Sequence, residues 1–395
     1  MSTNVSKPIY IQACGFHSAM GASATDIHQC LSGQRNANMV RDDQALNTGA
    51  STIVGRVDDS LPNIPKHLSQ FDTRNNQLAL SALKQIEQDV QQAVSQYGSS
   101  RIAVIVGTST SGISDGEVAF KHKLDDGEYP QEYHYRKQEL GNSSEFVAQY
   151  FGITGPCYSI STACSSSGRV FISAQRLLRS GLVDAVVVGG ADTICQLTLN
   201  GFHGLEALSS NLCQPFSDDR DGINIGESAA FMLLSNQHSP VALLGAGDSS
   251  DAHHISAPHP EGNGAEQAMN KALNDAGLTI NDIGYINAHG TATPLNDSME
   301  SKAIYRLFGS SVPVSSTKPL TGHTLGAASA TEAAIAWHLL KHDLPLPIQH
   351  CQNRAEDIQV NLVESTTKLQ GKAILSNSFA FGGNNISLIF GYTHD

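Results

Sequence analysis

The sequence predicts an α/β protein built from two similar halves, and three observations support this. Strand-like and helix-like segments alternate along the chain, and the same order of segments occurs twice. No Pro- or Ser-rich linker separates the repeats. The chain has 395 residues, of which 40% are hydrophobic and only 15% are charged, so it can bury a large interior.

The first half is predicted to span residues 1–240. It opens with the strand-like segment IYIQACG, which ends at Gly15. A β-prone run at 157–161 leads through small residues into an amphipathic helix that ends at Gly181, and an apolar strand follows at 183–192. The apolar face of that helix comprises Val170, Phe171, Ala174, Leu177 and Leu178.

The second half, residues 241–395, repeats this order. It opens with VALLGAG at 241–247, has a strand at 283–286, and carries a strand, loop and small-residue helix at 312–340. A further apolar strand occupies 372–383. Two polar segments, 115–145 and 194–222, fit neither pattern and are predicted to be irregular insertions or lids.

Composition excludes several classes of protein. The formal net charge of −13 argues against nonspecific nucleic-acid binding. No run approaches the roughly 20 apolar residues of a membrane span, and the N-terminus lacks a basic leader, so we expect a cytoplasmic protein. Seven scattered cysteines without a CxxC pair argue against a disulfide framework or a zinc-finger site.

Cys164 is the first candidate catalytic residue. It precedes the predicted helix in the run ISTACSSSG, where a helix N-terminus and unpaired N–H groups favour the thiolate form. The small neighbours leave room for a bulky substrate. The alternative from the residues alone is a buried structural cysteine.

Two further segments offer catalytic side chains. His289 follows a strand in NAHGTATP, a good position for a functional imidazole, although a histidine bonding its own turn is the alternative. Lys318 and His323 flank a glycine turn that opens a helix carrying Glu332. Lys318 and Glu332 are single charges in otherwise uncharged segments, so a buried Lys318 or Glu332 needs a partner. We expect the two to pair with each other, or Glu332 to position the site residues without contacting the substrate.

The segment NSFAFGGNN at 377–385 ends a strand with aromatic residues and glycines. It predicts a bendable loop that carries a bulky aromatic plug, with Phe379 and Phe381 beside Gly382, and whose backbone N–H groups form an oxyanion hole. An ordinary hairpin turn is the alternative. A metal site made by one cysteine and two histidines is not expected, because no carboxylate accompanies His289.

Taken together, STACSSS, NAHGTATP, STKPLTGHTLGAA and NSFAFGGNN resemble the motifs of the elongating β-ketoacyl-[acyl-carrier-protein] synthases of the thiolase superfamily. The resemblance covers nearly the whole chain, including PFSDDRDGINIGESAAFMLL before the second half. It implies the duplicated thiolase-like fold, a five-layer αβαβα arrangement. It also implies that the enzyme has no resident cofactor, because acyl chains arrive as phosphopantetheine thioesters.

The resemblance implies a role for each residue. Cys164 takes up the acyl chain, while His289 and His323 stabilise the enolate left when the malonyl thioester loses CO₂. Backbone N–H groups of Cys164 and Phe381 form the oxyanion hole. Lys318 supports the histidines electrostatically, and the acid Glu332 lies behind Lys318 and helps to position the site residues.

Two departures from the family pattern stand out. Ala380 and Asn384 replace a glycine and a threonine of the gating loop, which alters the freedom of the loop around Phe381. Asn296 stands where glycine is common and tolerates the same turn. The segment GINIGESAAF and residue Asn296 resemble the corresponding positions of ketosynthases from bacterial aryl polyene type II polyketide systems.

The resemblance also implies partners: an acyl carrier protein, and a second subunit that is either an identical copy or a chain-length-factor homologue. Because carrier and chain are both acidic, carrier docking requires a local basic patch. The candidates are Arg74, Lys121, Lys123, Arg136, Lys137 and Arg220.

Three alternative functions remain. A thiolase would carry a second catalytic cysteine near its C-terminus, and a priming synthase would carry asparagine in the loop that here holds His323. The third is a noncatalytic partner subunit that only shapes the substrate tunnel.

Overall fold

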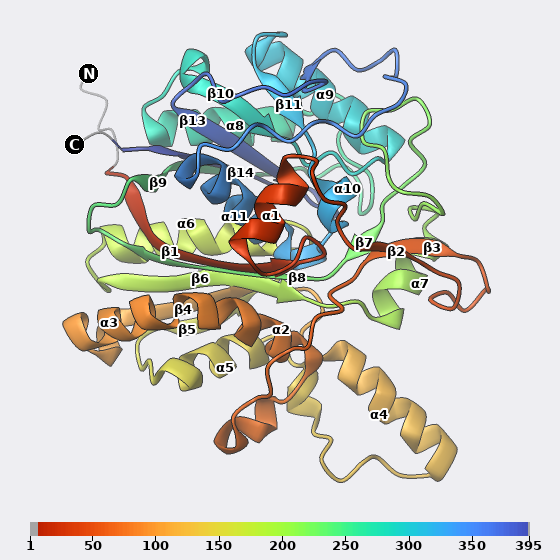
Figure 1. Ribbon diagram of the computed structural model, residues 1–395, viewed down its shortest axis with the longest axis vertical. Coiled ribbons are helices and arrows are strands. Elements are labelled where there is room, and N and C mark those ends of the chain that lie inside the picture. The colour runs from red at the N-terminus through yellow and green to blue at the C-terminus, as the bar shows by residue number, and fades with distance from the viewer. Residues whose placement is uncertain (1–6, 394–395) are drawn as a thin grey trace.

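The computed structural model describes residues 7–393, so the first six residues of the predicted N-terminal segment lie outside the described part. Within 7–393 an 11-stranded sheet has the order β12-β11-β10-β13-β14-β9-β1-β8-β6-β4-β5 (Figure 1). The five strands of the first half are β1 (Ile9–Ser18), β4 (Ile102–Gly107), β5 (Cys157–Ile160), β6 (Ala185–Asp192) and β8 (Ser228–Ser235). Those of the second half are β9 (Val241–Ser250), β10 (Ile283–Asn287), β11 (Pro313–Ser315), β13 (Ala373–Phe379) and β14 (Asn384–Tyr392), with β12 (Asn361–Leu362) added at the edge.

The two halves have the same strand order, which confirms the predicted duplication. Reading inward from the edge, β5-β4-β6-β8-β1 corresponds to β11-β10-β13-β14-β9. In each half the first two pairings are parallel and the last two antiparallel. The half-sheets join where Ile9 and Tyr10 of β1 pair with Leu243 and Ala242 of β9.

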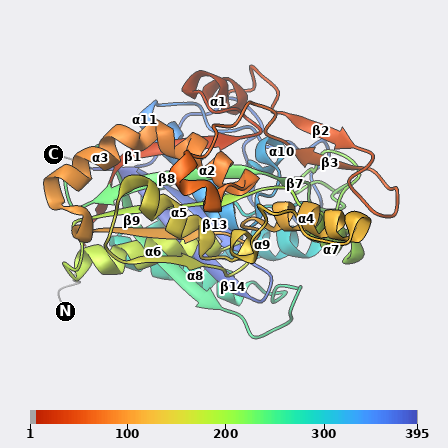
Figure 2. The same ribbon diagram turned by 90° about the horizontal axis from the view of Figure 1, so that it is seen from below.

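Helices cover both faces of each half-sheet and produce five layers (Figure 1). The outer layer of the first half holds α2 (Arg74–Leu83), α3 (Glu87–Tyr97) and α5 (Asn142–Phe151), seen together from below in Figure 2. The outer layer of the second half holds α8 (Asn263–Ala276) and α9 (Pro294–Phe308). Between the half-sheets lie α6 (Ser166–Arg179) and α11 (Ala328–Lys341), which contact strands of both. The chain therefore has the thiolase-like αβαβα fold.

The two central helices pack closely because their contact faces carry small residues. A Cβ added to Gly168 of α6 would lie 2.8 Å from Ser329 Oγ of α11, closer than real Cβ contacts allow. The Ala330 backbone N–H donates to Ser167 Oγ at 2.9 Å. The helix that follows Cys164 and the helix that follows His323 are thus in close contact.

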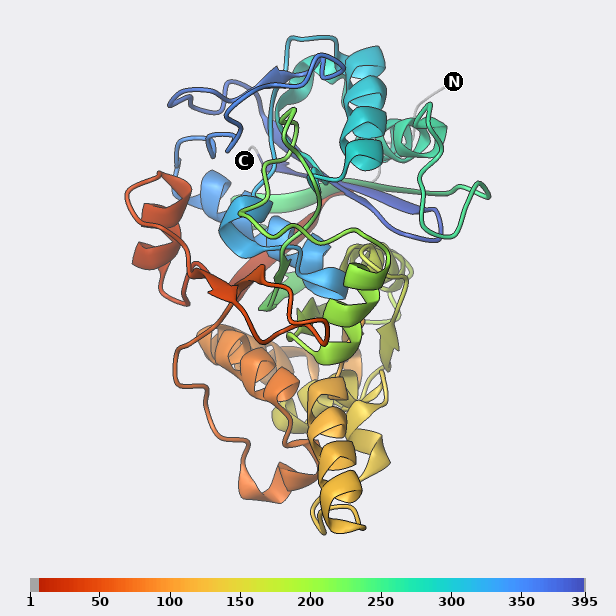
Figure 3. The same ribbon diagram turned by 90° about the vertical axis from the view of Figure 1, so that its right-hand side faces the viewer.

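The prediction of irregular insertions was wrong in one respect. Residues 115–145 contain α4 (Ile113–Asp126), which reaches away from the body of the molecule (Figure 3), and the start of α5. The segment 194–222 begins with α7 (Gln196–Gly204), which packs against α4. The sequence pattern did not reveal α4 because most of its surface is polar and exposed: the helix buries only Gly116 and Ala119.

The remaining elements frame the site and the molecular surface. They are α1 (Ala24–Leu31), α10 (Lys318–Thr321), and a small sheet of β2 (Met39–Asp42), β3 (Thr52–Gly55) and β7 (Ile225–Gly226). Across residues 7–393, no helix is both long and apolar enough to cross a membrane.

Candidate active site

The candidate catalytic residues meet because each follows the carboxyl end of a strand. Cys164 follows β5, His289 follows β10, and Lys318 and His323 follow β11. Phe381 lies in the turn after β13. Loops at strand carboxyl ends are where α/β sheets build sites, and the stacked half-sheets bring these loops together.

Cys164 lies two residues before the first residue of α6 and is 6% exposed. The preceding residue, Ala163, has a φ of 52°, a left-handed conformation that costs an alanine free energy and turns the chain sharply. Ser329 Oγ of α11 lies 3.5 Å from the Cys164 carbonyl oxygen. The sulfur is therefore presented by a sharply turned loop between the strand and the helix.

His289 and His323 face Cys164 from the other half of the chain. One ligand atom of each of the three side chains lies within 4.8 Å of the others. The two imidazole centroids are 5.5 Å apart with an interplanar angle of 86°. The Leu325 N–H donates to His323 Nδ1 at 3.0 Å, so the neutral ring carries its proton on Nε2. His289 Nδ1 is buried without a hydrogen-bond partner.

Both imidazoles are held neutral. Burial, followed by the nearby positive charge of Lys318, lowers the pKa of His323 to about 3. The same two causes, with a contribution from His323, lower the pKa of His289 well below its usual value. Neutral rings that carry an N–H proton donate hydrogen bonds without adding charge to the cavity.

Lys318 and Glu332 are partners, as the sequence analysis expected. Lys318 Nζ lies 2.6 Å from Glu332 Oε1, and both side chains are buried. Ser378 donates its hydroxyl proton to Glu332 Oε2 at 3.2 Å. The pair lies beside the cysteine and both histidines, since the Lys318 charge influences the pKa of all three.

The NSFAFGGNN segment is a hairpin that also contributes to the site. Strands β13 and β14 pair up to Phe379 and Asn385, and Gly382 and Gly383 take φ values of 79° and 77° in the turn. The backbone N–H groups of Phe381 and of Cys164 itself interact with the Cys164 thiol. Two donors thus converge where an oxyanion would form.

A cavity of about 290 Å³ opens in front of these residues. Cys164, His289 and His323 line it, together with the gating residues Phe379 and Phe381. Much of the remaining wall is apolar, formed by Phe202, Leu205, Ala257, Pro258 and Leu295. Gly382 does not line the cavity but forms the adjacent turn.

The expected thiolate is not supported at neutral pH. Burial raises the pKa of Cys164 to about 11, although the Lys318 charge and the two backbone N–H groups act in the opposite direction. The helix position suggested a thiolate, but the sequence did not show that the sulfur is nearly excluded from water. A pKa this high favours the protonated thiol at neutral pH.

The sequence analysis missed the acid that holds the His289 loop. Glu300, on α9, accepts the backbone N–H of His289 at 2.8 Å and that of Gly290 at 2.7 Å. Asn377 Nδ2 donates to the same carboxylate at 3.3 Å. Glu300 lies one helical turn after Asn296 in NDSME, and two acids close together after the His289 loop were the available signal.

The predicted basic patch is not gathered in one place. Arg74 pairs with buried Glu227 at 2.6 Å, and Arg220, only 9% exposed, pairs with Asp357 at 3.0 Å. These two guanidinium groups are already engaged within the chain. The other four residues lie on α4 and the 3₁₀ turn Tyr135–Gln138: Lys121, Lys123, Arg136 and Lys137.

The structure also bears on the metal argument. The three ligand atoms of Cys164, His289 and His323 are close enough to one another to bind one ion. The absence of a bound metal here remains a prediction.

Family models for β-ketoacyl synthases match both halves of the chain. The N-terminal domain model matches residues 7–239, and the C-terminal domain model matches residues 241–352. The chain belongs to the β-ketoacyl synthase family. It is therefore an acyltransferase of this class.

Curated relatives agree with this assignment. The synthase is 32% identical over 351 residues to the 3-oxoacyl-[acyl-carrier-protein] synthase 2 of Staphylococcus aureus (strain COL), covering 83% of this chain and 85% of the relative. It is 38% identical over 257 residues to the protein of the same name from Rhizobium meliloti (strain 1021), covering 60% and 61%.

Solved structures are similar over almost the full length. The ketosynthase ApeO from Xenorhabdus doucetiae, solved in complex with its chain length factor ApeC, is 49% identical with a TM-score of 0.94 and 98% coverage of both chains. The ishigamide ketosynthase/chain length factor is 26% identical with a TM-score of 0.87, covering 98% of this chain and 100% of that one.

Proposed function

We propose that this synthase lengthens an acyl chain by two carbons through decarboxylative Claisen condensation with malonyl-[acyl-carrier-protein]. The observation that carries the proposal is the convergence of Cys164, His289 and His323 in one largely apolar cavity. A nucleophile, two neutral N–H donors and a pair of backbone donors are the groups that this reaction requires.

In the first step the Cys164 sulfur attacks the thioester carbonyl of an acyl chain on the carrier protein. The oxyanion forms beside the backbone N–H groups of Cys164 and Phe381. The proton lost from the Cys164 thiol is balanced by the proton that the departing phosphopantetheine thiolate takes up. The acyl chain remains on Cys164, and its apolar tail occupies the aromatic and aliphatic wall of the cavity.

In the second step a malonyl thioester binds with its carbonyl oxygen facing His289 and His323. Loss of CO₂ leaves an enolate, whose oxygen accepts hydrogen bonds from the two imidazoles. Its carbon attacks the acyl-Cys164 carbonyl, and the sulfur leaves and takes up a proton. No base removes a carbon-bound proton, so the pair of neutral imidazoles is sufficient.

Lys318 and Glu332 act through the other residues in this proposal. Burial keeps both imidazoles neutral and the Lys318 charge acts in the same direction, whereas that charge opposes the effect of burial on the thiol. Glu332 balances that charge at 2.6 Å. The reaction as proposed uses no resident cofactor or metal and takes place in the cytoplasm.

The proposed second subunit is a chain-length-factor homologue rather than an identical copy. ApeO, which is 49% identical over 98% of both chains, was solved with such a factor. In this chain β5 is the edge strand of the sheet, with Cys157 and Tyr158 exposed. The α4 residues Val118 and Leu124 are each 70% exposed and add an apolar surface.

The similarity to ApeO, together with GINIGESAAF and Asn296, supports an aryl polyene product over a saturated fatty acid.

The proposed contact for the carrier protein remains the four basic residues on α4 and the following turn. Asp125 and Asp126 on the same helix weaken the attraction of this surface for an acidic carrier.

Two observations favour this function over its alternatives. A scaffold subunit would not need a cysteine, two neutral imidazoles and converging backbone donors in one cavity. A thiolase would place a second cysteine there, but Cys351 does not line the cavity, and position 323 is histidine rather than the asparagine of a priming synthase.

The test is reconstitution with carrier-bound substrates. The chain is purified alone and with a co-expressed chain-length-factor homologue, then supplied with acyl- and malonyl-carrier protein, and all species are followed by intact mass. We expect an acyl adduct on Cys164 and a carrier-bound β-keto product two carbons longer. Cys164→Ala serves as the control and should form neither species.

An acyl adduct without any extended product, with or without the partner, would contradict the condensing function. Absence of an adduct on Cys164 in both preparations would favour the scaffold alternative. Product formation by the chain alone at the full rate would contradict the proposed heterodimer.

A further inference from the structure

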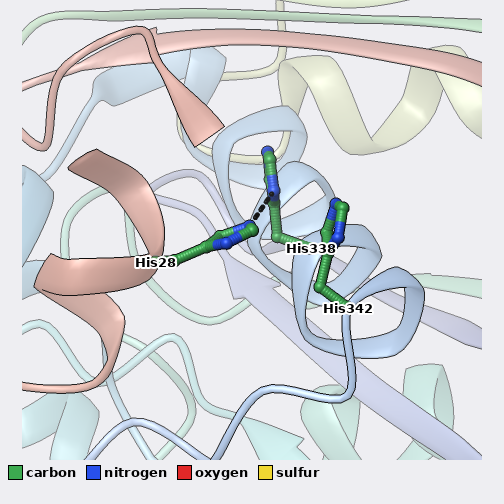
Figure 4. A group of neighbouring side chains, drawn as sticks. All are labelled: His28, His338 and His342. Atoms are coloured by element: carbon green, nitrogen blue, oxygen red, sulfur yellow. Dashed lines mark hydrogen bonds between the residues drawn. The ribbon is translucent and has the colours of Figure 1, made fainter. Parts of the chain in front are cut away.

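A second cluster of chemically active side chains lies away from the cavity. It consists of His28 on α1, His338 on α11 and His342 directly after the end of α11 (Figure 4). None of the three lines the catalytic cavity. One nitrogen of each ring lies within 4.8 Å of the others.

The geometry of the cluster follows from the packing of α1 on α11. His338 lies in the last turn of α11 and His342 caps its C-terminal end four residues later, so both project from the same side of the helix end (Figure 4). Ile27, Cys30 and Leu31 of α1 belong to the same apolar core as Leu339 and Leu340, which positions His28 against that face. The His28 and His342 ring centroids are 4.5 Å apart.

A simple hydrogen bond does not account for all three rings. His28 Nε2 and His338 Nδ1 are 3.2 Å apart, which is one hydrogen bond. His342 takes no part in that hydrogen bond. Its ring stacks on that of His338, with the two centroids 5.7 Å apart. Two ligands of a tetrahedral Zn²⁺ ion, each about 2.0–2.1 Å from the metal, lie about 3.3 Å apart, close to the distance observed here.

We propose that His28, His338 and His342 form a binding site for a single Zn²⁺ ion. Imidazole nitrogens suit Zn²⁺, and two histidines four residues apart on a helix, joined by a third from a neighbouring helix, provide three of its four ligands. In residues 7–393 no carboxylate or thiol joins the group, so water completes the coordination on the exposed side of His342.

A neighbouring aromatic ring positions two members of the cluster. The Trp337 ring packs against both His338 and His342, with centroids 5.1 and 5.8 Å away, which restricts their rotation. His342 needs only a side-chain adjustment to bring its nitrogen to ligand distance, because it is exposed.

The bound ion would clamp α1 to the C-terminal part of α11. The same helix carries Ser329 and Glu332 near its N-terminal end, where they face the catalytic loop and Lys318. The proposal concerns stability and metal content, and it does not rest on the proposed condensing function.

The test measures Zn²⁺ binding by the full-length, untagged chain after treatment with a chelator. Because Cys164, His289 and His323 could also hold an ion, every variant is made in a Cys164→Ala background. Isothermal titration calorimetry gives the affinity, and elemental analysis after dialysis gives the stoichiometry. The variants are His28→Ala and His342→Ala, with His67→Ala, an exposed histidine on another surface, as the matched control.

We expect one Zn²⁺ per chain in the background protein and in His67→Ala. Loss of a group that merely orients a ligand weakens metal binding by about 10- to 100-fold, so His28→Ala and His342→Ala should each lose at least about 10-fold. Zn²⁺ should raise the Tm of the background protein but not of these two variants. Circular dichroism confirms that the variants are folded.

Equal affinity in the background protein and His342→Ala would overturn the proposal, because the exposed third ligand would then be irrelevant. Less than one Zn²⁺ per chain after dialysis of the background protein would also overturn it.

Discussion

Lys318 Nζ lies 2.6 Å from Glu332 Oε1, and the charges of this buried pair influence the protonation of the groups around it. The two side chains are only 3% and 4% exposed. Burial raises the pKa of Glu332, and the Lys318 charge opposes that effect. Burial is the larger cause of the pKa shifts of Cys164, His289 and His323, and the Lys318 charge acts to lower the pKa of each of them. One ion pair thus contributes to the protonation of three candidate catalytic groups.

Lys318→Met should destabilise the fold at neutral pH by about 3–5 kcal/mol, because Glu332 would be left as an uncompensated buried charge. Its pKa would rise further, so the folded state would bind a proton that the unfolded state releases. Stability should therefore fall as pH rises from 5 to 7, and the deficit should be smaller at pH 5. Urea unfolding at both pH values measures this.

The double variant Lys318→Met, Glu332→Leu is the control for that prediction. Removing both charges should recover most of the lost stability, since no buried charge remains. A double variant as unstable as the single one would show that the loss arises from packing.

Alkylation of Cys164 by iodoacetamide should become faster with pH across pH 7–10, by about tenfold per unit, because only the thiolate reacts. Burial raises the pKa of this thiol to about 11, so ionisation is incomplete throughout that range. Mass spectrometry of the Cys164 peptide gives the rate. A plateau between pH 7 and 8 would instead support the thiolate expected from the helix position.

His289→Ala and His323→Ala should each reduce malonyl decarboxylation by about 10²–10³, because each removes one hydrogen bond to the developing oxyanion. Acyl loading of Cys164 should fall far less, because its oxyanion is held by backbone N–H groups. Release of labelled CO₂ and the mass of the acyl-enzyme separate the two steps. Equal losses in both steps would contradict the assigned roles.

Gly383→Ala should impair the gating turn much more than Gly382→Ala. Both glycines have positive φ, so an alanine is strained at either position, by about 1–2 kcal/mol. A Cβ at position 383 would in addition lie 2.0 Å from the Asp251 carbonyl oxygen, whereas at 382 the nearest atom is 4.0 Å away. The rate of acyl loading and the Tm of the two variants test this contrast.

Val118→Glu with Leu124→Glu should weaken assembly with the second subunit by at least about tenfold, because two carboxylates would enter an apolar contact. Both residues are 70% exposed, so the isolated chain should remain folded. Ile280→Glu, an exposed apolar position in the second half, is the control. Size-exclusion chromatography with the co-expressed partner gives the result, and unchanged assembly would remove α4 from the interface.

Much of the architecture could be predicted because the chain repeats its pattern. The strands at IYIQACG and VALLGAG became β1 and β9, which occupy equivalent positions in the two half-sheets. Alternation of buried strands and small-faced helices depends on local periodicity, which a sequence displays directly. The polar helix α4 was missed because it buries only Gly116 and Ala119 and therefore shows little of that periodicity.

The candidate catalytic groups were likewise readable from the sequence, since Cys164, His289, Lys318 and His323 each stand among small residues shortly after a strand. The charge states of these groups could not be predicted from the sequence. Protonation depends on how much water reaches each group and on which charges lie within a few ångströms, and residues far apart along the chain determine both. Only the folded molecule shows that Cys164 is buried beside Lys318, that Glu300 holds the His289 loop, and that Arg74 and Arg220 are already paired.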